Sequence, residues 1–178
     1  NTPDKEIIFF SIGFETTIPL PAFELSQGPP DNFSIISAHK LVPPAMDVLL
    51  NLENIRINGF ILPGHVCTIT GSNIYKPYTE EYKTPMVVGG FEPNDVLISI
   101  YSLLKQYLNN DAKVENLYTR VARDEGNLAA QKIIEEVFIP CDSHWRGLGK
   151  IPNSGLEIQP HVEQFDALKK FETGEVEE

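Results

Sequence analysis

The chain alternates between short, unbroken apolar runs and longer segments with a helical period. Four runs carry no charge and are bounded by turn or breaker residues: Ile7–Ile12, Phe33–Ala38, Gly59–Leu62 and Met86–Val88. Continuous rather than alternating apolar runs are typical of strands in a parallel sheet that is covered on both faces. The pattern therefore predicts four buried parallel strands.

Helical periodicity follows these runs. Three sets of apolar positions repeat at helical spacing: Val42, Met46, Leu49 and Leu50 behind Pro43 and Pro44; Val96, Leu97, Ile100, Leu103, Leu104 and Leu108 behind Pro93 and Asp95; and Ala130, Ile133, Ile134 and Val137 behind Asn127 as N-cap. Proline in a first turn and Asn at an N-cap are both favourable. The alternation predicts an α/β fold: an open, mostly parallel sheet of about four βα units with helices on both faces.

The C-terminal segment differs in composition. From Glu163 onward, six acidic residues stand against two lysines: Glu163, Asp166, Glu172, Glu175, Glu177 and Glu178 against Lys169 and Lys170. We expect a single α/β domain over residues 1–158 and an acidic helix or tail over 159–178.

A polar tripeptide follows each predicted strand. The four are Gly13-Phe14-Glu15, Ala38-His39-Lys40, Gly64-His65-Val66 and Gly90-Phe91-Glu92, and their first residues recur every 25 or 26 positions. Open α/β sheets bind ligands at the carboxyl ends of their strands. Glu15, His39, His65 and Glu92 are therefore candidate site residues, with helix capping as the alternative for each.

Two His and two Glu can ligate a divalent metal or form an acid/base network, and the spacing decides neither. Thr16 and Thr17 offer hydroxyls to a small anion or form an ordinary cap. In an extended segment, His65 and Cys67 would point the same way, which gives a weak soft-metal signal beside the alternative of a buried Cys67. Cys141 and His144, three apart, are a weaker signal still.

Two further segments carry motif-like features. Gly64–Gly71 lacks the Gly-Lys-Ser/Thr ending of a phosphate loop, and no dinucleotide fingerprint occurs, so the fold is Rossmann-like without that motif. In Trp145–Gly155, Gly and Pro fix the path of the chain, and the only Trp stands beside Arg146. We interpret Trp145 and Arg146 as a partner-docking surface, with a packed Trp145 anchor as the alternative.

Composition narrows the function classes. The 178 residues are 42% apolar and 10% aromatic, enough for one sizeable core, and the formal net charge of -11 argues against nucleic-acid binding. Two cysteines exclude a disulfide scaffold and fit a reducing cytoplasm. No apolar run reaches membrane-spanning length and no signal peptide is evident, so we expect a cytoplasmic protein without membrane contact. The absence of an initial Met suggests a trimmed piece.

Six motifs in one order resemble the HypD family of hydrogenase maturation factors. They are Gly13-Phe14-Glu15-Thr16-Thr17; Ser37-Ala38-His39-Lys40-Leu41-Val42-Pro43-Pro44-Ala45; Pro63-Gly64-His65-Val66; Gly90-Phe91-Glu92-Pro93 with Asp95; Tyr118-x-Arg120 through Glu125-Gly126-Asn127; and Trp145-Arg146-Gly147 through Ile151-Pro152-x-Ser154-Gly155. The match runs from about Asp4 to Leu156.

The resemblance implies a scaffold that assembles the iron, cyanide and carbon monoxide group of nickel-iron hydrogenases with the small chaperone HypC, cyanide arriving from HypE. It implies two facing α/β domains plus a cluster-binding extension, of which this chain is similar to the second α/β domain. Glu15, Thr16, Thr17, His39, His65 and Glu92 would then line a cleft and position ligands and protons.

The chain also departs from the family. The upstream Cys-Gly-x-His motif, a Cys pair implicated in iron handling and the Cys set for a four-iron four-sulfur cluster are not in these residues, and Cys67 stands where Ser is expected. The isolated chain is therefore expected to hold no cofactor and to lack catalysis of its own. The alternatives are a metal-assisted or acid/base enzyme using the His and Glu cluster, and an interaction module docking through Trp145–Gly155.

Overall fold

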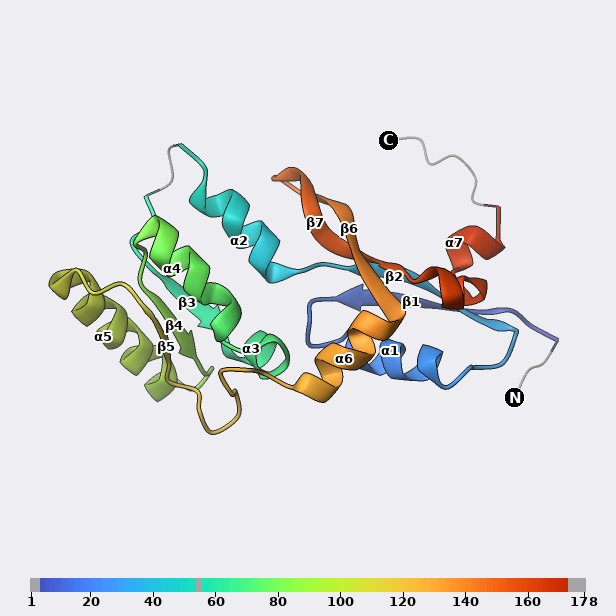
Figure 1. Ribbon diagram of the computed structural model, residues 1–178, viewed down its shortest axis with the longest axis horizontal. Helices are drawn as coiled ribbons and strands as arrows, with labels where there is room; N and C mark the ends of the chain where they lie inside the picture. The colour runs from blue at the N-terminus through green and yellow to red at the C-terminus, as the bar shows by residue number, and fades with distance from the viewer. Residues whose placement is uncertain (1–3, 54–55, 173–178) are drawn as a thin grey trace. The chain divides into compact units, whose positions relative to one another are not determined.

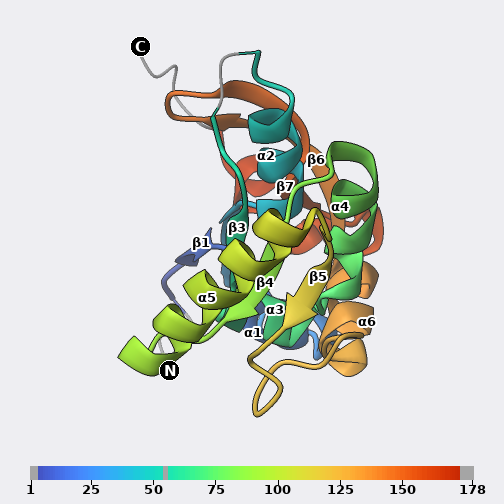
Figure 2. The same ribbon diagram turned by 90° about the vertical axis from the view of Figure 1, so that its left-hand side faces the viewer.

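The computed structural model describes residues 4–53 and 56–172. The chain divides into two compact units, each described here by itself: unit 1, Asn1–Leu41 with Lys132–Glu178, and unit 2, Val42–Gln131. Figures 1 and 2 show the elements of both. Glu175, Glu177 and Glu178 of the expected tail lie outside the described residues.

Unit 1 combines a parallel strand pair with an antiparallel hairpin. Strand β1 (Ile7–Gly13) pairs with β2 (Phe33–His39) from Ile7↔Phe33 to Gly13↔His39. Strands β6 (Phe138–Trp145) and β7 (Gly149–Ile158) form the hairpin. The helical elements are α1 (Pro19–Ser26), the 3-10 helix η2 (Pro160–Phe165), α7 (Ala167–Lys170) and the end of α6 (Leu128–Val137), which begins in unit 2.

One apolar core joins these elements. Its buried members come from α1, β2, α6, the hairpin and η2: Ile18, Ala22, Leu25, Ile35, Val137, Phe138, Leu156, Ile158 and Phe165. The predicted helix behind Asn127 is confirmed, because the Asn127 side chain accepts the Ala130 N–H at 3.1 Å and the helix begins at the next residue.

Unit 2 is a three-stranded parallel sheet with helices. Strands β3 (Phe60–Pro63), β4 (Met86–Gly89) and β5 (Val114–Asn116) stand in the order β3-β4-β5. The helical elements are α2 (Val42–Leu50), α3 (Gly64–Thr70), the 3-10 helix η1 (Asn73–Tyr75), α4 (Lys76–Tyr82) and α5 (Pro93–Asn109).

The two faces of this sheet differ. Leu62, Met86 and Val88 pack in one cluster with side chains of α2, α3 and η1. Alternate strand residues face opposite sides, so Gly89 faces the other way, and there it meets Ser99 of α5. Helix α5 thus lies along the second face (Figures 1 and 2).

The predicted α/β class with parallel strands and flanking helices is confirmed, and all four predicted strands are present. They belong to two sheets rather than one. The prediction that β1 is buried is wrong: Ile7, Ile8, Phe9, Phe10 and Ile12 are 45–61% exposed, because none of them belongs to either apolar core of the described residues. The single domain over 1–158 stays a prediction.

The contact between β4 and α5 depends on a missing side chain. A Cβ added to Gly89 would lie 2.5 Å from Ser99 Oγ, and Ser99 is fully buried. We expect Gly89→Ala to lower the free energy of unfolding by about 1–3 kcal/mol through overpacking.

The control for that measurement is a double substitution. Ser99→Ala removes the clashing oxygen, so the Gly89→Ala, Ser99→Ala variant should lose less stability than the two single losses added together, as measured by chemical denaturation. Simple additivity would contradict the close approach as the cause.

Candidate functional site

The predicted polar turns lie at the carboxyl ends of parallel strands in both units. In unit 1, Gly13 at the end of β1 is the register partner of His39 at the end of β2. In unit 2, Pro63 at the end of β3 is the partner of Gly89 at the end of β4. Unit 1 thus contains Glu15, Thr16, Thr17 and His39, and unit 2 contains His65 and Glu92.

The turn after β1 is closed by Thr17. Gly13 has a φ of +140°, and a Cβ there would lie 2.3 Å from Thr17 Oγ1, so a side chain at this position is excluded. Thr17 Oγ1 donates to the carbonyl of Phe14 at 3.0 Å and of Ile12 at 3.3 Å. The Thr17 hydroxyl therefore holds the turn, whereas Thr16 is exposed and Glu15 is buried.

His39 is buried rather than projecting from the strand end. It is 2% exposed, with Nε2 3.1 Å from Ser11 Oγ and Nδ1 3.4 Å from Ser37 Oγ. Its ring stands edge-on to Phe138 at 5.7 Å. Burial lowers the pKa of His39 to about 4, because the desolvated ring resists protonation. His39 is thus a neutral hydrogen-bonding group at the base of the turn.

Unit 2 gathers polar and aromatic side chains at its strand ends, which we name the strand-end cluster: His65, Phe91, Glu92, Asp95, Tyr118 and Arg120. Tyr118 is buried and the Asp95 side chain is 13% exposed, while the other members are exposed. His65 is exposed on the first turn of α3, and its ring lies 4.3 Å from that of Phe91 and 6.1 Å from that of Tyr118.

Two glycines let the cluster close. A Cβ on Gly64 would lie 2.3 Å from the Gly89 carbonyl oxygen and 2.6 Å from the Tyr118 ring. A Cβ on Gly90 would lie 2.0 Å from Asp95 Oδ2. The absence of a side chain at Gly64 and at Gly90 thus makes room for the cluster.

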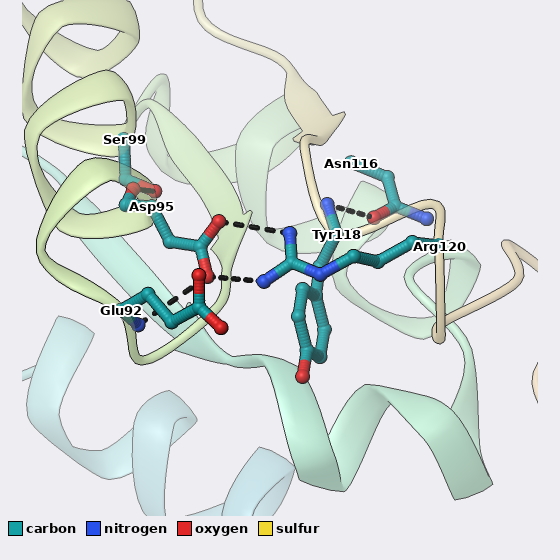
Figure 3. A network of polar contacts seen from close by, with 6 residues as sticks. All are labelled: Glu92, Asp95, Ser99, Asn116, Tyr118 and Arg120. Carbon is teal, nitrogen blue, oxygen red and sulfur yellow. Dashed lines mark hydrogen bonds and ion pairs between the residues drawn. The ribbon is translucent and has the colours of Figure 1, made fainter.

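Asp95 and Arg120 form a bidentate ion pair in this cluster (Figure 3). Arg120 Nη1 donates to Asp95 Oδ1 at 2.8 Å and Nη2 to Oδ2 at 2.5 Å. Asp95 Oδ2 also accepts the Glu92 N–H at 3.3 Å, at the start of α5. Hydrogen bonding from Arg120 lowers the pKa of Asp95 and raises that of Arg120.

The Arg120 guanidinium also lies over an aromatic ring. Its central carbon is 4.6 Å from the centre of the Tyr118 ring, a cation–π geometry, and half of the Arg120 side chain is exposed. The cluster therefore places the Asp95–Arg120 ion pair beside an exposed imidazole and the exposed Glu92. Such a group can hydrogen-bond a polar ligand and exchange protons with it.

A second network holds the loop that carries Tyr118 and Arg120. Asn116 Oδ1 accepts the Tyr118 N–H at 3.0 Å, and Asn116 Nδ2 donates to the Ala122 carbonyl and to Asp124 Oδ1. Ser72 donates to the same Asp124 oxygen at 2.6 Å. These hydrogen bonds, first that from Ser72, lower the pKa of Asp124, so an ionised carboxylate fixes the loop.

The weak metal signals find no support in this geometry. The segment with His65 and Cys67 is helical, so the extended geometry assumed for it is wrong, and Cys67 is buried while His65 is exposed. Cys141 and His144 lie on strand β6 rather than on one turn. Across residues 4–53 and 56–172, no three His, Cys, Asp or Glu side chains gather as metal ligands.

Trp145 ends strand β6, at the turn of the hairpin that β6 forms with β7. Its Nε1 donates to Ser154 Oγ at 2.8 Å, and its ring lies 6.1 Å from that of Phe14. Trp145 is half-buried and Arg146 is exposed in the turn. These contacts favour the anchor for Trp145, and docking by Arg146 stays a prediction.

Sequence reasoning missed Asp95, Tyr118 and Arg120 as members of a site. Asp95 was expected only at a helix start, and the strand that delivers Tyr118 and Arg120 is just three residues long. The usable signal was the Tyr118-x-Arg120 motif shortly after Val114–Asn116.

None of the helices in the described part of the chain has the length and apolarity needed to cross a membrane.

The fold and the strand-end cluster define an α/β protein with polar side chains at the carboxyl ends of its parallel strands and without a dinucleotide motif. The sequence profile of the HypD family, described as "Hydrogenase formation hypA family", matches residues 1–178. The chain therefore belongs to the HypD family.

Named relatives agree. The chain is 45% identical to a hydrogenase expression/formation protein of Methanocaldococcus jannaschii, covering 98% of this chain and 49% of the relative. It is 40% identical to the hydrogenase maturation factor HypD of Azotobacter vinelandii (96% and 48% covered) and 39% identical to that of Escherichia coli (95% and 46%). The chain spans about half the length of the curated relatives it matches.

The buried His39 predicts a pH-dependent stability. Its pKa rises from about 4 when folded to about 6.5 when unfolded, so the unfolded state binds more protons between these values and stability falls as the pH falls through them. Between about pH 7.5 and about pH 5, the chain should lose about 2 kcal/mol that a His39→Gln variant keeps. Urea denaturation at the two pH values measures the loss of stability, and an equal loss in the native chain and in His39→Gln would refute His39 as its cause. His161→Gln, at an exposed position, is the control.

The ion pair predicts a measurable titration. The pKa of the Asp95 carboxyl is lowered in the native protein, so it should rise in an Arg120→Gln variant. As acid is added, Asp95 should then be protonated, and stop stabilising the folded state, at a higher pH than in the native protein. Carbon-13 NMR of the carboxyl group measures this directly. Arg123→Gln serves as the matched control, and an unchanged Asp95 titration in Arg120→Gln would show that Arg120 is not the cause.

Proposed function

We propose that this chain is the central part of a HypD-type scaffold that helps assemble the iron, cyanide and carbon monoxide group of nickel-iron hydrogenases. The observation that carries the proposal is the match to the HypD family over residues 1–178, together with relatives named as hydrogenase maturation factors. The cargo in this proposal is the iron group, and the chain acts in a complex with a HypC-type chaperone and a HypE-type cyanide donor.

The strand-end cluster supports a role in positioning rather than in holding iron. Asp95 takes two of the five N–H donors of the half-exposed Arg120 guanidinium, and the others can donate hydrogen bonds to the nitrogen atoms of cyanide ligands. His65 and Glu92, both exposed beside it, are placed to exchange protons with the cargo or with a partner. We assign iron ligation to cysteines outside these 178 residues.

A four-iron four-sulfur cluster does not fit the residues present. Such clusters take Cys thiolates, usually four, and the sequence contains two cysteines. Cys67 is buried, and burial is the main cause of a raised pKa at the Cys141 thiol, which makes it a poor thiolate ligand. No step of the proposed function runs through a cluster in this chain. A cytoplasmic location is part of the same proposal.

The proposal is tested by a chimera with a relative of this chain. This chain would replace the matched region of Escherichia coli HypD in a strain lacking that protein, and nickel-iron hydrogenase activity would be assayed. We expect the hydrogenase activity of the chimera to be clearly above that of the deletion strain. In His65→Ala and Arg120→Gln variants of the chimera, that activity should fall about tenfold or more.

Controls separate function from folding. The amount of chimera and the amount of co-purified chaperone should be unchanged by His65→Ala, and His161→Ala should keep full activity. A chimera that accumulates and binds the chaperone but gives no hydrogenase activity would contradict the proposal, as would full activity in both cluster variants.

A further inference from the structure

Helix α5 buries polar side chains and exposes apolar ones, the reverse of an ordinary surface helix. The side chains buried against the sheet are polar: Ser99, Ser102 and Gln106 are 0–7% exposed. Eight large apolar residues of the same helix are 39–76% exposed: Val96, Leu97, Ile98, Ile100, Tyr101, Leu104, Tyr107 and Leu108. A surface helix normally buries its apolar face, so this surface is suited to contact another body.

The orientation is fixed by specific contacts. Ser99 fits against Gly89, and its Oγ donates to the Asp95 carbonyl at 2.7 Å. Ser102 donates to Glu115 Oε2 on β5, which also accepts from Gln106 Nε2 at 3.2 Å. Gln106 Oε1 accepts the Lys113 N–H at 3.1 Å. Rotating α5 to bury its leucines would leave these polar groups without their partners.

The exposed face has the pattern of a helix-packing seam. Leu97, Tyr101, Leu104 and Leu108, which we name the α5 stripe, are spaced by four, three and four residues and are 56–76% exposed. Alternating steps of three and four present one row of side chains to a partner helix. Between Asp95 and Asn109, Lys105 is the only charged residue, so the stripe suits an apolar partner.

A hollow lies beside the stripe. Its volume is about 220 Å³, and beside Tyr101 and Leu117 it is lined mainly by polar and charged residues, among them Lys105, Asn109 and Glu115. A hollow of this size next to an apolar ridge can receive a side chain of a packed element.

The curated relatives supply a candidate for that element. This chain covers 46–49% of the length of each of the three relatives described above, so each has about as much polypeptide again outside the match. We propose that, in a full-length HypD polypeptide, the α5 stripe packs against a helix from the part outside this match. The contact would be an interface within one polypeptide.

A chimera tests this with matched substitutions. The chain would replace the matched region of the Methanocaldococcus jannaschii relative, and thermal unfolding would be compared between the chimera and the 178-residue chain. In the isolated chain, Leu104→Glu changes an exposed side chain, and Tm should stay within about 1 °C. In the chimera, the same change buries a carboxylate, and Tm should fall by several degrees. Leu128→Glu, at a residue 63% exposed on α6, is the control and should show no such difference.

Hydroxyl-radical footprinting gives a readout that does not depend on the variants folding. Oxidation of Leu97, Tyr101, Leu104 and Leu108 should fall at least about fivefold from the isolated chain to the chimera, with Leu128 little changed. Equal oxidation in both proteins would overturn the proposal. Protection of the stripe in the isolated chain that grows with its concentration would overturn it too, by assigning the surface to a second copy.

Discussion

The carboxylate of Asp95 joins the turn between β4 and α5 to the loop after β5, a segment separate in sequence. It accepts the N–H of Glu92 at the start of α5, pairs with Arg120 from the loop after β5, and occupies the space that a side chain at position 90 would fill. A carboxylate in these contacts must stay ionised, and the Arg120 hydrogen bonds ensure this by lowering its pKa. Helix capping, loop position and the charge of the strand-end cluster therefore depend on one group, and any ligand at the cluster meets an arginine whose orientation is already set.

The two units solve the same problem at their strand ends with different chemistry. In unit 1 the polar group, His39, is buried and neutral and serves the turn between strands. In unit 2 the half-exposed, charged Arg120 lies over the Tyr118 ring, and the exposed ring of His65 lies against that of Phe91. Residues at corresponding places in successive βα turns thus have unlike environments, and membership of a strand-end turn does not assign a chemical role.

The sequence was informative where local physics decides the outcome. Continuous apolar runs located β1 to β4, although β1 is not buried, and Asn127 marked the start of α6, because strand propensity and capping leave local signals. The hairpin around Trp145 was missed, since its glycines were interpreted as a loop, and β5 was too short to leave a signal. The sequence showed the apolar face of α5 but did not show that this face is exposed, because periodicity defines a helix face without saying what covers it. The burial of His39 likewise depends on Phe138, which is remote in sequence.

The polar inner face of α5 also affects how unit 2 responds to temperature. Burial of apolar surface gives unfolding its large positive heat-capacity change, whereas burial of polar surface reduces it. Ser99, Ser102 and Gln106 fill positions where leucines would ordinarily be buried. The contact between α5 and the sheet is therefore expected to add less to the heat-capacity change of unfolding than an apolar contact of the same area would, while the apolar cluster on the other face of the sheet adds the usual amount.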